Sequence, residues 1–271
     1  MFTITGFADE LGPDFESQMK VWSEMGLKYF ELRSAWGTNV MLLTDEQVYK
    51  VKEISDRYGI KVSCIGSPIG KTNIEDPIDF EMKRLERAFW MAKLFGCGRV
   101  RVFSFYCKEG SILDHREEVM DRLSKMAAYA AENGIELLHE NEANIYGQYS
   151  RESAEIAATL KSKYFGLVFD PANYSVAKED ALEAEKNMHP YITYFHCKDY
   201  SGHDMDMAIP GTGVSYIPEV LDRLRERDMF VSMEPHLDHA GQFGGQTAPE
   251  KYKEAVQAVK DILDRLQIKW Q

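Results

Sequence analysis

Acidic and imidazole side chains recur at four places in the second half of the chain. The segments are LLHENE at 137–142, LVFDPAN at 167–173, YFHCKD at 194–199 and VSMEPH at 231–236. In each segment an apolar run typical of a strand ends in a carboxylate or an imidazole. Three carboxylates gathered in one small space repel one another and raise each other's pKa unless a cation lies among them. If the four strand ends meet, the pattern predicts a divalent metal site.

Alternation of side chains along a strand assigns these residues to faces. Phe195, Val231 and Met233 suit packing against helices, which leaves the polar residues of the opposite face for the site. The residues assigned to that common face are Glu140, Asp170, His196 and Glu234. A single acidic residue at a strand end is more often a helix N-cap or a salt-bridge partner than a metal ligand. Four such residues on successive strands, all on matching faces, are hard to explain by chance. Three carboxylates and one imidazole favour Mn²⁺, Mg²⁺ or Co²⁺, with Zn²⁺ and Fe²⁺ also compatible, so we expect one divalent ion.

The elements that position these residues alternate along the chain. Strands are predicted at 2–8, 28–33, 60–66, 99–105, 135–141, 165–170, 191–198 and 229–235. Helices are predicted at 14–25, 44–58, 75–95, 114–132, 151–162, 178–188, 215–227 and 248–266. Several helices end at a glycine just before the next strand, as in YGIKVS at 58–63 and ENGIEL at 132–137.

Eight such alternations with short connections require a parallel sheet, and eight parallel strands close most naturally into a barrel. The length of 271 residues is close to the roughly 250 typical of this architecture. The competing doubly wound sheet usually carries a glycine-rich phosphate loop after its first strand, and GFADELGPD at 6–14 has no such loop. We therefore expect an α/β fold, a (β/α)8 TIM barrel that forms one domain over 1–271.

The composition of the chain limits the classes of partner and the cellular compartment that we expect. The net charge of −12 argues against a nucleic-acid partner, which needs a concentrated basic face. No apolar run reaches the length of a membrane span, and MFTITGFADE lacks the basic flank and long apolar run of a signal peptide, so we expect a strand there. The four cysteines are scattered, which favours buried reduced thiols in a cytoplasmic protein.

Segments in this order along the strands resemble the xylose isomerase-like TIM barrels, in particular the sugar-phosphate isomerase and epimerase group. The matching segments are FADELGPDF at 7–15, YFELR at 29–33, GSPIGK at 66–71, HEN at 139–141, FDPAN at 169–173, FHCKD at 195–199, PGTG at 210–213 and MEPH at 233–236. The resemblance covers nearly the whole chain. It implies carbohydrate metabolism, a metal held by Glu140, Asp170, His196 and Glu234, and often a homo-oligomer.

The resemblance also implies a mechanism. A metal that binds a ketose through its carbonyl and neighbouring hydroxyl lowers the cost of an enediolate, and two carboxylates then remove and return a proton. It assigns these catalytic roles to Glu140 and Glu234. Two positions depart from the family pattern: Asn173 stands where many epimerases have a histidine, and no arginine lies between Asp199 and Pro210. Because both positions usually touch substrate, the identity of the sugar stays open.

Further residues are candidates for contact with substrate. Glu142 and His236 lie two positions beyond expected ligands, and hydrogen bonding to those ligands is their alternative role. Asp199 is either a substrate contact or a loop cap, and Lys71 either meets an anionic group or is a solvated lysine. Trp36 either lines the sugar site or packs in the core.

Other residues of the same strands are expected to be structural. Glu31 is expected to pair with Arg33, and His139 to be a hydrogen-bonded core histidine. Lys198 shares the facing of His196, and a salt bridge in the mouth is its structural alternative. The glycine-rich loops at 201–213 and 236–245 are expected to act as lids.

Two other functions fit the same residues. A metal-bound enediolate that expels a β-hydroxyl gives a dehydratase, as in inosose-dehydratase-like relatives. A non-catalytic sugar-binding barrel is the second alternative. The apurinic endonucleases share this barrel, but they need a multinuclear zinc cluster with more histidines and a basic groove, which conflicts with the net charge of −12.

Overall fold

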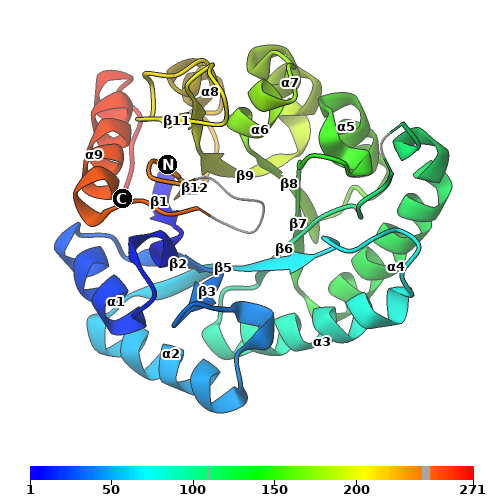
Figure 1. The fold of residues 1–271 in the computed structure, drawn as a ribbon, viewed down its shortest axis with the longest axis horizontal. Coiled ribbons are helices and arrows are strands. Elements are labelled where there is room, and N and C mark those ends of the chain that lie inside the picture. The colour runs from blue at the N-terminus through cyan, green and yellow to red at the C-terminus, as the bar shows by residue number, and fades with distance from the viewer. Residues whose placement is uncertain (109, 240–244) are drawn as a thin grey trace.

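The strands of the chain form one parallel sheet that curls into a ring. The structure is a computed structural model that describes residues 1–108, 110–239 and 245–271, so residues 240–244 of the second expected lid lie outside the described residues. Figure 1 looks along the ring and shows the strands at the centre with the long helices around them. The eight strands are β1 (Phe2–Gly6), β2 (Tyr29–Leu32), β5 (Lys61–Ile69), β6 (Arg99–Val102), β7 (Glu136–Glu140), β8 (Phe165–Phe169), β9 (Ile192–Cys197) and β12 (Met229–Met233).

Neighbouring strands pair in the order β1-β12-β9-β8-β7-β6-β5-β2, and each pair in this sheet is parallel. The ends of this order, β1 and β2, lie side by side in Figure 1, so the barrel is nearly closed. Each of the eight predicted strands is present, and the predicted single-domain TIM barrel is confirmed.

The outer layer consists of helices that connect successive strands, together with α9, which follows the last strand. They are α1 (Phe15–Glu24), α2 (Asp45–Tyr58), α3 (Ile78–Phe95), α4 (Arg116–Asn133), α5 (Ser150–Thr159), α6 (Pro171–Val176), α7 (Ala181–Met188), α8 (Ile217–Arg223) and α9 (Pro249–Arg265). The helix α2 illustrates how local sequence sets the bounds. Thr44 and Gln47 form a reciprocal capping box at its start, and Gly59 ends it in the left-handed conformation with φ of 66°.

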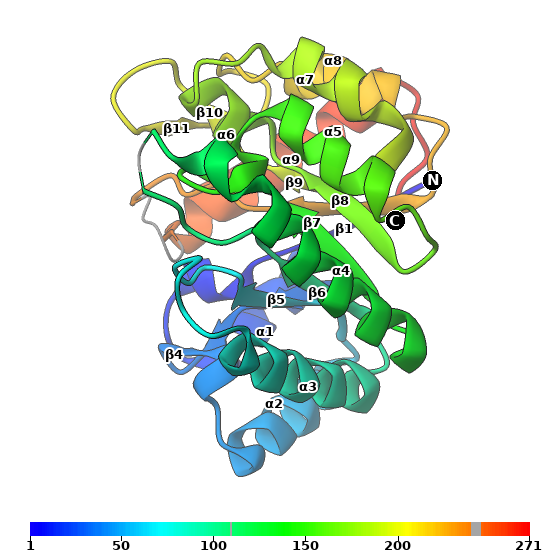
Figure 2. The same cartoon turned by 90° about the vertical axis from the view of Figure 1, so that its right-hand side faces the viewer.

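Two short hairpins extend the connections at the carboxyl ends of the strands: β3 (Ser34–Ala35) with β4 (Thr38–Asn39), and β10 (Asp199–Tyr200) with β11 (Met207–Ala208). Figure 2 shows β4, β10 and β11 at one end of the barrel and both chain termini at the other. The carboxyl ends of β7, β8, β9 and β12 are also in register, since Glu140 pairs with Val168 and His196 with Ser232. The fold therefore brings the polar strand ends together at one mouth.

The core lies mainly between the sheet and the helices. Phe195, Val231 and Met233 belong to this outer core, as alternation predicts. A smaller cluster of Cys64, Leu138, Val168 and Tyr194 fills the inside of the barrel. All four cysteines are buried and free of disulfides. None of the helices in the described parts of the chain has the length and apolar character that a bilayer span requires.

Candidate metal centre

The four expected ligands lie together at the carboxyl end of the barrel. Glu140 ends β7, Asp170 directly follows β8, His196 lies in β9, and Glu234 directly follows β12. All four residues are buried, and one potential ligand atom from each lies within 4.8 Å of the others. Leu138, Val168 and Tyr194, two positions earlier on three of these strands, form the apolar layer beneath them. Alternation along the strands therefore explains why the polar groups converge above an apolar floor.

Cationic groups lie against these carboxylates. Nδ1 of His196 lies 2.8 Å from Glu140 Oε1 and 3.2 Å from Glu234 Oε2. Nζ of Lys198 lies 2.6 Å from Asp170 Oδ2, which confirms the salt bridge given as the structural alternative for this lysine. Arg101, on β6, donates from Nη1 to Glu140 Oε2 at 3.0 Å. The centre is thus a compact, largely buried arrangement of alternating charges.

The protonation states follow from burial and from these neighbours. Burial alone favours the neutral carboxyl of Glu140, but His196 and Arg101 lower its pKa to about 2. For Asp170 burial is the largest influence and raises the pKa to about 6, although Lys198 opposes the rise. Burial would lower the pKa of His196, yet the charges of Glu140 and Glu31 raise it well above its ordinary value. Without a metal, the imidazole is therefore a cation among carboxylates.

The donor atoms fit a divalent ion. Asp170 Oδ2 and Glu234 Oε2 are buried and lie in ion-pair range of Lys198 and His196, but no aligned hydrogen bond reaches either oxygen within the described residues. Both oxygens therefore retain capacity to bind a cation. Three carboxylates and one imidazole within 4.8 Å form the kind of oxygen-rich set that hard divalent ions prefer. Binding would require His196 to lose its extra proton, as metal binding to imidazole does in general.

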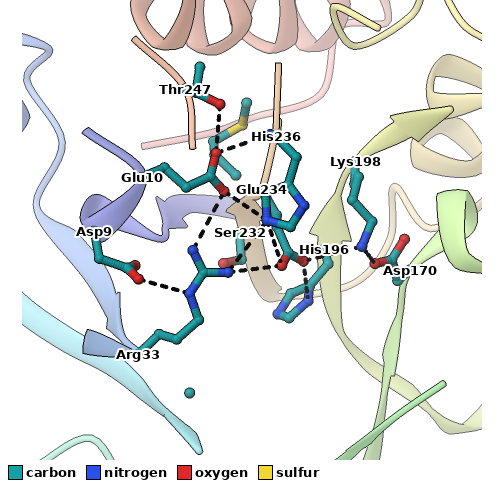
Figure 3. A network of polar contacts seen from close by, with 12 residues as sticks. Asp9, Glu10, Arg33, Asp170, His196, Lys198, Ser232, Glu234, His236 and Thr247 are labelled. Carbon is teal, nitrogen blue, oxygen red and sulfur yellow. Dashed lines mark hydrogen bonds and ion pairs between the residues drawn. The ribbon is translucent and has the colours of Figure 1, made fainter. Parts of the chain in front are cut away.

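The second carboxylate oxygen of Glu234, Oε1, belongs to a separate network of polar contacts, which is drawn in Figure 3. Arg33 donates from Nε to Asp9 Oδ2 at 2.9 Å and from Nη1 to Glu234 Oε1 at 3.2 Å. His236 Nε2 lies 3.2 Å from Glu234 Oε1 and 3.3 Å from Glu10 Oε1. His236 also has a φ of 49°, a strained value for a residue other than glycine.

Three members of this network, Asp9, Glu10 and Arg33, were not predicted as site residues from the sequence. Asp9 and Glu10 lie just beyond β1, and Arg33 lies just beyond β2. The rule that polar groups at carboxyl ends of strands form the site applies to these strands as well. Applied to the first half of the barrel, it would have identified all three.

A cavity of about 560 Å³ opens above this floor. It is lined by Arg33, Asn39, Pro68, Lys71, Arg101, Tyr106, Glu140, Glu142, Ala143, Asn144, Gln148, Asn173, Val176, Ala177, Lys198, Met205, Met207, Glu234 and His236. Charged groups form its inner end, while Val176, Ala177, Met205 and Met207 provide an apolar wall. A volume of this size is typical of sites that enclose a small molecule.

The expected substrate contacts divide into two groups. Glu142, His236 and Lys71 line the cavity. Lys71 is not the solvated lysine considered as its alternative, since Nζ lies 2.6 Å from Glu142 Oε2 and its side chain is 8% exposed. Among the described residues, Asp199 and Trp36 are outside this lining.

Asp199 has the role of a loop cap. Its carboxylate accepts hydrogen bonds from the backbone N–H groups of Gly211, Gly213 and Ser215 at 2.8–3.1 Å. Trp36 packs on Phe15, with ring centroids 5.6 Å apart, and faces a separate hollow beside α2. Neither position offers a side chain to the cavity.

Two structural expectations are wrong. Glu31 was expected to pair with Arg33, but its carboxylate points across the barrel, where Ser232 donates to it and His196 Nε2 lies 3.2 Å away. The register shift between Phe30 and Glu31 accompanies this orientation. His139 was expected to be a hydrogen-bonded core residue. It is fully buried, and neither ring nitrogen has a hydrogen-bond partner among the described residues, so burial lowers its pKa to about 4.

Comparisons with known proteins agree on the architecture. The family model described as "Xylose isomerase-like TIM barrel" matches residues 19–265. No curated protein matches the chain.

Solved structures share the fold at low identity. They include a probable 3-DHS dehydratase, AsbF, from Bacillus anthracis (15% identity, TM-score 0.73, 96% of this chain and 98% of that one). A D-tagatose 3-epimerase-like protein has 20% identity and a TM-score of 0.75, over 98% of both chains. The IOLI protein, solved with a bound zinc atom, has 17% identity and a TM-score of 0.79, over 98% of this chain and 99% of that one. The shared feature is the fold.

Proposed function

This chain belongs to the xylose isomerase-like TIM-barrel family, and on that premise we propose that it is a metal-dependent isomerase or epimerase of a small sugar, sugar phosphate or polyol. The observation that carries the proposal is the convergence of Glu140 and Glu234 on one point. Their carboxylates lie 2.8 and 3.2 Å from the same nitrogen of His196, at the inner end of a cavity large enough for a carbohydrate. Two bases and a cation site at one point are what proton transfer next to a carbonyl requires.

The ligand set in this proposal is Glu140, Asp170, His196 and Glu234, with Mn²⁺, Mg²⁺ or Co²⁺ as the favoured ion. When bound, such an ion supplies Lewis-acid polarisation of a ketose carbonyl and its neighbouring hydroxyl, which lowers the cost of forming an enediolate. Side chains of the protein carry out the proton transfer and stabilise the charge that develops on the substrate.

Glu234 takes the proton from the carbon beside the carbonyl, and the C–H electron pair moves toward the carbonyl oxygen to give the enediolate. Its pKa lies well below the ordinary value, because Lys198 and His236 outweigh the effect of burial, so the carboxylate is ionised and able to accept. Glu140, proposed to lie on the other side of the reacting carbon, returns a proton. Its carboxylate is ionised at rest because its pKa is about 2, so it first takes up that proton from solvent. Return to the neighbouring carbon gives an isomer, and return to the same carbon from the other side gives an epimer.

Cationic groups around the floor stabilise the charge that develops on the substrate. Lys198 and Arg101 line the cavity, and nearby carboxylates raise the pKa of each above its ordinary value despite burial, so both stay charged. In the outer part of the cavity, Glu142, His236 and Lys71 are proposed to contact substrate hydroxyls or an anionic group. Asn173 also lines the cavity, where it donates from Nδ2 to the backbone oxygen of Asn141 at 2.8 Å.

Solvent exchange tests the proposal. We expect the Mn²⁺-loaded protein, incubated in D₂O with a panel of ketopentoses and ketohexoses, to exchange the proton beside the carbonyl of one of them, observed by ¹H NMR. Glu234→Gln should abolish this exchange while substrate binding is largely retained. Glu53→Gln is the control, since Glu53 is an exposed carboxylate on α2. Exchange by Glu234→Gln at the wild-type rate would contradict the assignment.

A dehydratase is the second candidate, supported by the similarity of the fold to the probable 3-DHS dehydratase AsbF. The same enediolate would then expel a β-hydroxyl as water, with a neighbouring cation as proton donor. Mass spectrometry of the products separates the two reactions, because isomers and epimers keep the mass of the substrate and dehydration removes one water. Bound metal without turnover of any ketose or polyol would favour a sugar-binding barrel.

A further inference from the structure

The two ring nitrogens of His196 face different surroundings. Nδ1 points toward the candidate ligands, 2.8 Å from Glu140 Oε1 and 3.2 Å from Glu234 Oε2. Nε2 points the other way, into the barrel, and lies 3.2 Å from Glu31 Oε2. The side chains of His196 and Glu31 are both 0% exposed. The imidazole thus separates a carboxylate on β2 from the proposed metal centre.

The neighbours of Glu31 hold its carboxylate in this orientation. Ser232, on β12, donates from Oγ to Glu31 Oε2 at 2.9 Å. Gly66, on β5, leaves room for the side chain: a Cβ there would lie 3.2 Å from Glu31 Oε1 and 2.9 Å from a ring carbon of Phe7. Any larger residue at position 66 would press on both groups. The barrel therefore supports a buried carboxylate that is outside the set of proposed ligands.

Aromatic rings fix the plane of the imidazole as well. Phe7 meets His196 edge-on with centroids 5.2 Å apart and an interplanar angle of 80°. Tyr194 lies 5.8 Å away at 76°, from the layer below. With rings packed against it and no solvent contact, His196 has no room to exchange the positions of its nitrogens.

We propose that Glu31 is a positioning residue that accepts a hydrogen bond from Nε2–H of His196 and so directs the Nδ1 lone pair toward the metal. A neutral imidazole has one N–H and one lone pair, so a carboxylate at Nε2 determines which nitrogen is free to bind. The carboxylate also increases the basicity of the imidazole and fixes its orientation. The inference rests on the proposed function, because it concerns the same metal centre.

The geometry also argues against Glu31 as a ligand itself. The nitrogens of an imidazole diverge, and Glu31 lies beyond Nε2 while Glu140 and Glu234 lie beyond Nδ1. One ion cannot contact Nδ1 and Glu31 from opposite sides of the ring. Glu31 therefore acts through His196.

Metal affinity tests the proposal without reliance on activity. Metal-free wild type, Glu31→Gln, Ser232→Ala and Glu185→Gln are titrated with Mn²⁺ by calorimetry, after circular dichroism and thermal unfolding have established that each is folded. We expect Glu31→Gln to bind about 10- to 100-fold more weakly, with a smaller loss for Ser232→Ala. Glu185 is a matched control, a buried carboxylate that contacts His189 and Arg223 on the outside of the barrel, and its variant should bind like wild type.

A second measurement covers the case in which Glu31→Gln does not fold. Nitrogen chemical shifts of the Zn²⁺-loaded wild type, with His196 assigned by its alanine variant, should show a metal-bound Nδ1 and a protonated Nε2. A metal-bound Nε2, or Glu31→Gln with wild-type Mn²⁺ affinity, would overturn this inference and leave the metal centre standing. A wild type that binds neither ion would overturn the metal centre and this inference together.

Discussion

Replacement of Arg33 by methionine removes a buried guanidinium that three carboxylates share. Arg33 lies 2.9 Å from Asp9, 3.2 Å from Glu234 and 3.9 Å from Glu10, and its side chain is 4% exposed. The side chains of the three acids are 12%, 6% and 0% exposed, respectively. Methionine has a similar length and shape, so the change removes the charge more than the packing. The three carboxylates are then left to repel one another without that partner.

The magnitude follows from the cost of uncompensated buried charge. Breaking a buried ion pair by removing one partner costs about 3–5 kcal/mol, and we expect about 4 kcal/mol here because three acids share one cation. With a denaturant slope of roughly 3 kcal/mol per molar urea for a chain of this size, the midpoint of unfolding falls by about 1.3 M. The assay is urea unfolding at pH 7 in EDTA, followed by fluorescence and circular dichroism.

The matched control is Arg57→Met. Arg57 lies 2.9 Å from Glu16, but both side chains are about half exposed, and such pairs contribute about 0–1 kcal/mol. Without the guanidinium, the mutual repulsion of the three acids raises their pKa values in the folded state of Arg33→Met. The destabilisation is therefore present above the pKa that these acids have in the unfolded chain, and it shrinks as the pH falls toward that value. Equal losses for the two variants, or a gap that widens in acid, would refute this account of the network.

Two further perturbations test other parts of the structure. Burial lowers the pKa of His139 from 6.5 to about 4, so its neutral form contributes up to about 3 kcal/mol of stability above pH 6.5, which is lost as the pH falls through 4. His139→Leu should therefore flatten the acid limb of a plot of unfolding free energy against pH. An unchanged acid limb would exclude this histidine as its source. Gly70→Ala places a Cβ 2.1 Å from the backbone oxygen of Phe103 and should lower the free energy of unfolding by more than about 3 kcal/mol. The control Gly59→Ala has the same left-handed type of backbone but open space around the new Cβ, and should lower it by about 1 kcal/mol. Equal shifts of the thermal midpoint for the two variants would contradict this expectation.

Much of the fold could be predicted because its signals are local. Strand-helix alternation and the glycine at the end of α2 are properties of short segments, and each predicted strand is found with its bounds shifted by a few residues. The short helix α6 was missed, although its signals were present. Asp170 accepts from the N–H of Asn173 as an N-cap, and Pro171 occupies the first turn.

The site was predictable where alternation alone fixes the direction of a side chain. This was so for Glu140, Asp170, His196 and Glu234, and the structure brings them together while their roles stay proposals. The contacts of Arg33 with Glu234 and of Glu31 with Ser232 were not predictable, because each joins residues about 200 positions apart in sequence. Trp36 and Asp199 were candidates by position near strand ends, but local packing and backbone capping determine where they point.

The central claim is that four side chains from β7, β8, β9 and β12 hold one divalent ion. Metal analysis of the purified protein tests it most directly, after incubation with Mn²⁺ and removal of excess ion, beside His196→Ala prepared in the same way. The account predicts about one ion per wild-type chain and a large loss of bound metal in His196→Ala. Wild type without metal after this loading, or His196→Ala with the full complement, would contradict it.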